Sequence, residues 1–239
     1  MSDSVRGPAR GAWLAIAALV STWLVLDFMV QVARDQALSL WDITSPRATV
    51  ATRAMFNVAL LWAALAATRL ILLARGQTFA DLGWRRAAST RAWVLAIGLA
   101  ALYVGAVGAT FGGDAALLSD WSLYRISLAF VLGISAGVCG ELIFRGFVMG
   151  QARDAGLGVA LQVIFSSVLF ALALARFGWG GTTSPEWWSI IAVIVPTTIL
   201  GASFAGIYLM GRRSLMPVVV AHTMIDMALQ PGVLQMAYR

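Results

Sequence analysis

Long apolar stretches separated by short polar segments run through the whole chain. Seven of them match or approach the length of an α-helix that crosses a bilayer, which is about 20 residues. They are residues 12–33, 54–74, 92–112, 126–150, 157–177, 188–210 and 215–230. The pattern predicts an all-α fold, a polytopic transmembrane bundle of about seven spanning helices.

The first apolar stretch is longer than the apolar region of a signal peptide and lacks a small-residue cleavage site near its end, so we interpret it as an uncleaved spanning helix. No internal repeat or long linker is visible. We expect one integral membrane domain, with N-terminal transmembrane helices over residues 1–78 and a transmembrane core over 79–239. Residues 77–89 mix polar and apolar positions around Trp84, which predicts a short amphipathic segment at the membrane interface.

The composition supports a membrane protein. Hydrophobic residues make up 60% of the chain and charged residues 12%, whereas soluble domains carry about 25% charged residues. All 17 basic residues are Arg, and the 11 acidic residues include only two Glu. The absence of Lys is typical of a GC-rich bacterial genome, so we expect a multi-pass protein of the bacterial cytoplasmic membrane. Cys139 is the only cysteine, which excludes an internal disulfide framework.

The positive charge indicates an orientation in the membrane rather than a nucleic-acid surface. The formal net charge is +6, but the longest basic runs are the Arg pairs at 85–86 and 212–213. Both pairs lie between apolar stretches, where Arg residues orient membrane helices, so no nucleic-acid partner is predicted. An N-terminus on the inside would place nine Arg in the inside segments and six in the outside segments, which favours that orientation.

Two pairs of ionisable residues lie within the predicted spans. Glu141 and Arg145 are four residues apart, as are His222 and Asp226, so each pair projects from one helical face. A charge in the hydrocarbon costs about 2.5–3.5 kcal/mol, so these residues should face the bundle interior and have partners. The spacing leaves two interpretations open for each pair: an ordinary structural contact within one helix, or part of a polar functional site.

Small residues precede the first pair. Gly133 and Gly137 form a G-x-x-x-G step, which predicts close approach of another helix to this one. Asp27 and Arg69 also lie in predicted spans, and we expect partners for them inside the bundle or near its ends.

Three segments together resemble the motifs of one family. They are C-G-E-L-I-F-R-G-F at 139–147, S-S-V-L-F-A-L-A-L at 166–174 and L-M-P-V-V-V-A-H-T-M-I-D at 215–226. They are similar to the Abi-type CAAX protease and bacteriocin-processing (CPBP) family, whose pattern is E-E-x-x-x-R, then F-x-x-x-H, then H-x-x-x-N or D. The segment at 80–85 also resembles the interfacial segment of this family. The resemblance implies an intramembrane endopeptidase that processes prenylated or other membrane peptides.

The resemblance also implies roles for individual residues. In the family, the first Glu and the second-motif His activate a water, while the third-motif His and Asn or Asp stabilise the oxyanion. Here Gly140 stands at the position of the first Glu, and Leu174 at that of the second-motif His. Because the second Glu lies four residues before the Arg and the first is turned about 100° around the helix, Glu141 is interpreted as the structural partner of Arg145. The remaining candidate catalytic residues are Glu141, Arg145, His222 and Asp226.

These departures leave three functional hypotheses. The favoured one is a family member impaired or lacking in proteolysis that binds a lipidated peptide. The first alternative is an active peptidase with a rearranged base, either Glu141 or Asp226. The second is an isoprenoid- or lipid-modifying enzyme, since Trp faces can stabilise a cation. The expected partners are the lipid bilayer and a prenylated or membrane peptide. No cofactor or metal is predicted, because one His with two carboxylates falls short of a usual zinc site.

Overall fold

The computed structural model describes residues 3–43, 46–85, 89–111, 123–179 and 187–236. Within these ranges the regular secondary structure is helical throughout, with no strand, so the predicted all-α fold is confirmed. The elements are α1 (Asp3–Leu40), α2 (Pro46–Ala74), α3 (Thr90–Phe111), α5 (Leu123–Glu141), the π-helix η1 (Leu142–Val148), α6 (Met149–Asp154), α7 (Val159–Trp179), α8 (Trp187–Met210) and α9 (Met216–Met236).

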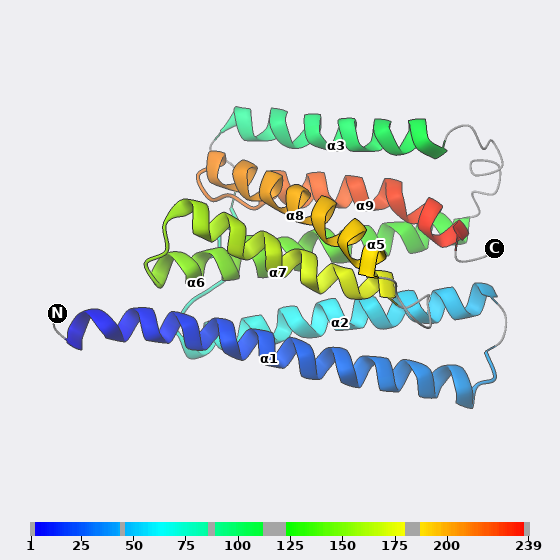
Figure 1. Ribbon diagram of the computed structural model, residues 1–239, viewed down its shortest axis with the longest axis horizontal. Coiled ribbons are helices and arrows are strands. Elements are labelled where there is room, and N and C mark those ends of the chain that lie inside the picture. Colours follow the sequence, from blue (N-terminus) through cyan, green and yellow to red (C-terminus); the bar gives the residue numbers. More distant parts are fainter. Residues whose placement is uncertain (1–2, 44–45, 86–88, 112–122, 180–186, 237–239) are drawn as a thin grey trace.

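The long helices lie side by side along the long axis of the bundle, and α5, η1 and α6 follow one another without a break (Figure 1). Each of the seven predicted apolar stretches coincides with one helix or with this continuous run. By length and composition, four described helical segments can cross a membrane: Ala9–Leu40, Ala51–Ala74, Ile126–Asp154 and Val193–Met210. Shorter apolar helical segments cover Thr90–Ala106, Val159–Leu174 and Met216–Leu229. The chain is a multi-pass membrane protein.

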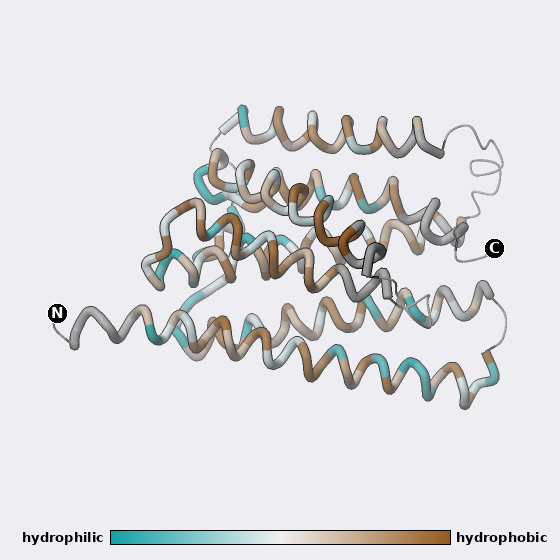
Figure 2. The backbone as a smooth tube through the Cα atoms, viewed as in Figure 1, coloured by the Kyte–Doolittle hydropathy of each residue, from teal (hydrophilic) through white to brown (hydrophobic). Residues whose placement is uncertain are grey.

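The closest helix pairings are α7 with α8, α5 with α9, α1 with α2, and α3 with α9. Hydrophobic residues lie along most of the coloured length of the long helices (Figure 2), so the outer faces are apolar as well as the core. Large exposed apolar side chains on those faces include Leu14, Leu24, Phe28, Leu70, Leu102 and Ile199. Such outer faces suit a bilayer as the surrounding solvent. The division into segments 1–78 and 79–239 remains a prediction.

The G-x-x-x-G step brings α5 and α9 into close contact, as the sequence predicted. A Cβ atom on Gly133 would lie 3.1 Å from the carbonyl oxygen of Thr223, and one on Gly137 would lie 3.0 Å from that of Val219. Only a residue without a side chain lets the two backbones approach this closely. The step therefore fixes the position of α9, which carries His222, against α5, which carries Glu141.

The turns that follow α2, α6 and α8 lie at the same end of the bundle as the start of α1 (Figure 1). The segment after α2 forms successive turns, and Leu82 and Gly83 are buried against the bundle. Gly83 adopts a φ of +97° and its carbonyl accepts a hydrogen bond from the Leu215 amide at 3.0 Å. This left-handed conformation explains the Gly, because side chains are strained there.

The other intramembrane charges have partners, as expected. Gln31 donates a hydrogen bond from Nε2 to Asp27 Oδ2 at 3.0 Å. Arg69 donates from Nη1 to the Gln77 carbonyl at 3.2 Å, and its guanidinium carbon lies 5.6 Å from the centre of the Phe79 ring. Both arrangements satisfy polar groups that the bilayer cannot hydrate.

A buried ionic cluster as candidate functional site

Glu141 is the last residue of α5, and the π-helix η1 starts directly after it. The wider turns of a π-helix are rare and occur frequently at functional sites. All seven residues of η1 are buried, including Arg145. Ser166 on α7 donates its hydroxyl to the Phe144 carbonyl at 2.8 Å, which satisfies an acceptor within the irregular segment. Nothing in the apolar pattern of the sequence predicted this change of helix type.

The carboxylate of Glu141 joins the first and third motifs. Its Oε1 accepts a hydrogen bond from Arg145 Nη1 at 3.1 Å and lies 2.7 Å from His222 Nδ1. The exposed fractions of these side chains are 0%, 0% and 3% for Glu141, Arg145 and His222. The predicted pairing of Glu141 with Arg145 is confirmed. The same oxygen also makes the short contact with His222, which spacing within one helix could not predict.

Arg145 is held by further groups in the interior. Its Nη2 donates to the carbonyl oxygen of Gly201 on α8 at 3.0 Å. The guanidinium carbon lies 4.2 Å from the centre of the Phe170 ring and 5.4 Å from that of Phe204. A buried cation needs a counter-charge and hydrogen-bond acceptors, and aromatic faces add attraction when the cation is desolvated. Arg145 therefore ties η1 to α7 and α8.

His222 packs between two aromatic rings at the centre of the cluster. The Phe204 ring stacks on it at 5.1 Å between centroids, and the Phe170 ring meets it edge-on at 5.5 Å. Its Nε2 lies 3.7 Å from Asp226 Oδ2, which is beyond hydrogen-bond distance. The imidazole is thus oriented by Glu141 from the neighbouring helix, and Asp226 makes only a longer ionic contact along α9.

Gly140 leaves a space on the His222 side of the cluster. A Cβ atom built there would lie 3.4 Å from His222 Cε1, 3.8 Å from His222 Nδ1 and 3.9 Å from Phe170 Cε2. These are ordinary van der Waals distances, so a larger residue could start from this position and point toward the imidazole. Leu174 lies one helical turn beyond Phe170 on α7 and is half-buried against the main apolar core.

Several polar atoms in the cluster lack a partner. Glu141 Oε2, Arg145 Nε and Ser167 Oγ are buried and make no hydrogen bond. A Cβ atom on Gly201 would lie 3.1 Å from both Arg145 Nη2 and Ser167 Cβ, so α8 approaches both η1 and α7 closely at this point. Unsatisfied buried polar atoms are rare in folded proteins and mark places where a water or a ligand group is received. A carboxylate oxygen, a guanidinium N–H and a hydroxyl together offer both hydrogen-bond donors and acceptors.

Two groups of this site lie outside the recognisable motifs. Phe204 and the Gly201 carbonyl come from α8, where the apolar sequence has no distinguishing pattern. They are assigned to the site because α8 packs against α7, which the sequence alone does not show. Among the described residues, no group of three or more His, Cys, Asp and Glu side chains could hold a metal ion.

Comparisons with known proteins agree with the motifs. Residues 121–228 match the family model described as Type II CAAX prenyl endopeptidase Rce1-like. No curated protein and no solved structure matches the chain. The matched residues contain all three motifs and every member of the buried cluster, Glu141, Arg145, His222 and Asp226 included. Over residues 121–228 the chain is therefore similar to the Rce1-like CAAX prenyl endopeptidases, a match that is consistent with the CAAX protease/CPBP family.

Proposed function

We propose that this protein binds a prenylated or other membrane peptide at the buried cluster without hydrolysing it at the rate of a conventional CAAX protease. The observation that carries the proposal is Gly140. A Cβ atom at this position would lie 3.4 Å from His222 Cε1. From this position the family's first Glu is expected to hold a water. A Gly at this position supplies no proton acceptor.

The chemistry of peptide hydrolysis explains why this loss matters. Water is a weak nucleophile, and a positioned general base contributes about 10²–10⁴-fold to the rate. The carboxylate that remains in the first motif, Glu141, is already engaged by Arg145 and His222 through one oxygen. Leu174 stands at the position of the second-motif His, the other residue with which the family activates water. Because His222 Nδ1 contacts Glu141, Nε2 is the ring nitrogen left to donate to a carbonyl oxygen.

A second candidate is an active peptidase in which Glu141 acts as the base. Its support is that Glu141 Oε2 is buried without a partner, while Oε1 lies 2.7 Å from His222 Nδ1. A water placed on Oε2 would be next to a carboxylate and an imidazole. Against this, Oε1 of the same carboxylate already contacts Arg145 and His222, which holds the group in place beside them.

The two candidates predict different fates for a substrate. Purified protein in nanodiscs would be incubated with a farnesylated CAAX peptide that carries a photo-crosslinker, with the non-prenylated peptide as control. We expect crosslinking that depends on the farnesyl group and no cleavage above a Glu141→Gln variant, compared at equal amounts of folded protein because this variant also loses an ion pair. Cleavage of the peptide by the wild type but not by this variant would favour the active peptidase. Absence of farnesyl-dependent crosslinking would overturn the binding proposal.

We also propose that the protein lies in the bacterial cytoplasmic membrane with its N-terminus inside. The turns with the Arg residues that favour this orientation lie at the end of the bundle where α1 begins. Ser39 and Gly158 are exposed at opposite ends, and Cys139 is buried. In intact cells, an impermeant thiol reagent should label a Ser39→Cys variant and spare a Gly158→Cys variant. The reverse pattern would contradict the orientation.

A further inference from the structure

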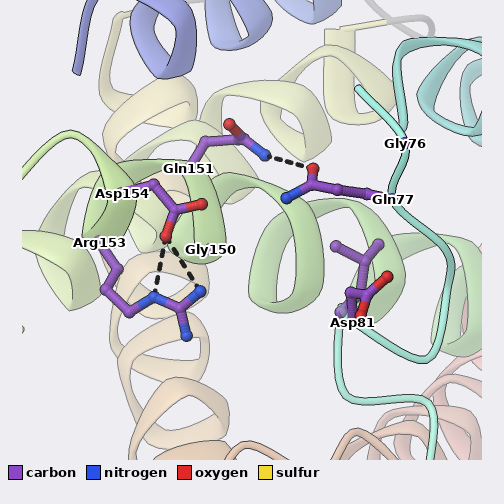
Figure 3. Close-up of a pocket in the computed structure, with 8 residues that line it drawn as sticks. Gly76, Gln77, Asp81, Gly150, Gln151, Arg153 and Asp154 are labelled. Carbon is purple, nitrogen blue, oxygen red and sulfur yellow. Dashed lines mark hydrogen bonds and ion pairs between the residues drawn. The ribbon is translucent and has the colours of Figure 1, made fainter. Parts of the chain in front are cut away.

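Two adjoining cavities open at the end of the bundle where α1 begins, away from the ionic cluster. Their volumes are about 320 Å³ and about 250 Å³. They share Asp81, Gly150 and Arg153. The larger cavity lies between the segment after α2 and α6 (Figure 3), and the smaller one is also lined by Tyr208 on α8 and by Arg213 just after it. We call the smaller one the basic cavity, because its lining includes Arg85, Arg153 and Arg213.

The basic cavity carries more positive than negative charge. Asp81 is the acidic residue in its lining, and this carboxylate is already occupied. Asp81 Oδ2 accepts hydrogen bonds from the Thr78 amide at 2.6 Å and the Thr78 hydroxyl at 2.8 Å. In the adjoining cavity, Asp154 is paired with Arg153 at 3.0 Å (Figure 3). The three guanidiniums therefore outnumber the carboxylates that could neutralise them.

Hydrogen bonds between two turns hold this cavity in shape. Tyr208 donates its hydroxyl to the Leu82 carbonyl at 3.1 Å, and Ser214 donates its hydroxyl to the Arg85 carbonyl at 2.7 Å. Arg85 donates from Nη2 to the Arg212 carbonyl at 2.9 Å. Because the segment after α2 is tied to the α8–α9 turn at several points, the cationic side chains start from fixed backbone positions.

One cationic group in the cavity has hydrogen-bonding capacity left. Arg213 donates from Nη2 to Gln162 Oε1 at 2.8 Å, but its Nη1 is buried and has no partner. Arg153 keeps a side chain that is 52% exposed despite its pair with Asp154. An anion with several acceptor oxygens would satisfy Arg213 Nη1 and neutralise the excess charge. Phosphate oxygens match the forked N–H groups of Arg best.

We propose that the basic cavity binds the phosphate of an anionic glycerophospholipid. The location favours a lipid over a phosphate from solution. The cavity lies where apolar helices end, which is the level of lipid headgroups in a bilayer. Met210, the last residue of α8, is exposed close to the Arg213 turn and offers an apolar surface to an acyl chain. This site is separate from the peptide site proposed above and does not depend on it.

The test measures lipid binding by the full-length protein in detergent. Native mass spectrometry would compare retention of phosphatidylglycerol with that of phosphatidylcholine, with and without inorganic phosphate as competitor at constant ionic strength. Arg153→Gln is the main variant because its guanidinium ties no turns together, and Arg213→Gln is the second. Arg91→Gln is the matched control, since Arg91 is an exposed cation at the start of α3 outside both cavities.

We expect the wild type and Arg91→Gln to retain phosphatidylglycerol in preference to phosphatidylcholine. Each cavity variant should lose about tenfold in apparent affinity, the effect of one charge-assisted hydrogen bond. Equal retention of the two lipids, or equal loss in Arg91→Gln, would overturn the proposal. Displacement of phosphatidylglycerol by inorganic phosphate at the same concentration as the lipid would also overturn it, because the site would then bind the free anion.

Discussion

Removing the charge of Glu141 should destabilise the whole fold. In a Glu141→Gln variant the side chain keeps its size, but Arg145 loses its counter-charge at a position where its exposed fraction is 0%. Breaking a buried ion pair by removing one partner costs about 3–5 kcal/mol, because an uncompensated charge stays buried. The Gly201 carbonyl and the two Phe rings still contact Arg145, so we expect the lower end, about 3 kcal/mol.

The assay is reversible unfolding of the full-length protein in mixed micelles, followed by circular dichroism during titration with dodecyl sulfate. A loss of about 3 kcal/mol shifts the unfolding equilibrium about 100-fold. Arg34→Gln is the matched control, because Arg34 and Asp35 form an ion pair of 2.8 Å with exposed fractions of 20% and 66%. An exposed pair contributes at most about 1 kcal/mol.

A double variant separates the ion pair from simple loss of packing. Glu141→Leu combined with Arg145→Met removes both charges, and replacing a buried pair by apolar residues is often neutral. This double variant should therefore be more stable than Glu141→Leu alone. If the two substitutions acted independently, their losses of stability would add and the double variant would be the less stable one. If Glu141→Gln unfolds like the wild type, or if the effects of the double variant simply add, the cluster does not stabilise the fold as argued.

Three further predictions follow from single contacts. Gly137→Ala should destabilise the protein by about 1–3 kcal/mol in the same assay, because its Cβ would lie 3.0 Å from the Val219 carbonyl, while Gly98→Ala, with no atom within 4 Å, should not. Ser166→Ala should cost about 1 kcal/mol by leaving the Phe144 carbonyl without its donor, and wild-type stability would contradict this. The hydrogen bonds from the Thr78 amide and hydroxyl lower the pKa of Asp81. The turn should therefore stay ordered at pH values above the usual carboxyl pKa and loosen as the pH falls through the lowered pKa. Hydrogen exchange at the Thr78 amide measures this, and Asp81→Ala, which removes the acceptor, should lose the protection already at neutral pH.

Much of the fold follows from local features of the sequence. The apolar stretches give the helices because a bilayer leaves the backbone no other way to satisfy its polar groups. Gly133 and Gly137 predicted a close helix contact, and spacing by four predicted that Glu141 meets Arg145. These inferences need only one helix and its periodicity.

The rest of the site depends on how separate helices are placed against one another. The contact of Glu141 with His222 requires the position of α9 along α5, which no single-helix pattern contains. The π-helix after Glu141 has no signature in the residue order. Phe204 comes from α8, where apolar residues are everywhere and none stands out. For the same reason Asp226 was the expected partner of the imidazole, whereas Glu141 makes the shorter contact.

The proposed loss of water activation rests on the absence of a side chain at Gly140 and on the replacement of His by Leu174, in a site that keeps the other motif residues. Restoring both groups tests it most directly, with Gly140→Glu and Leu174→His combined in the full-length protein. Gly140→Gln with Leu174→His is the control, since it has equal size and no base. The measurement is the rate of cleavage of a farnesylated CAAX peptide. We predict cleavage by the Glu-containing variant at least about 100-fold above the wild type and the control. Cleavage by the wild type at an equal or higher rate would contradict the proposed loss of water activation.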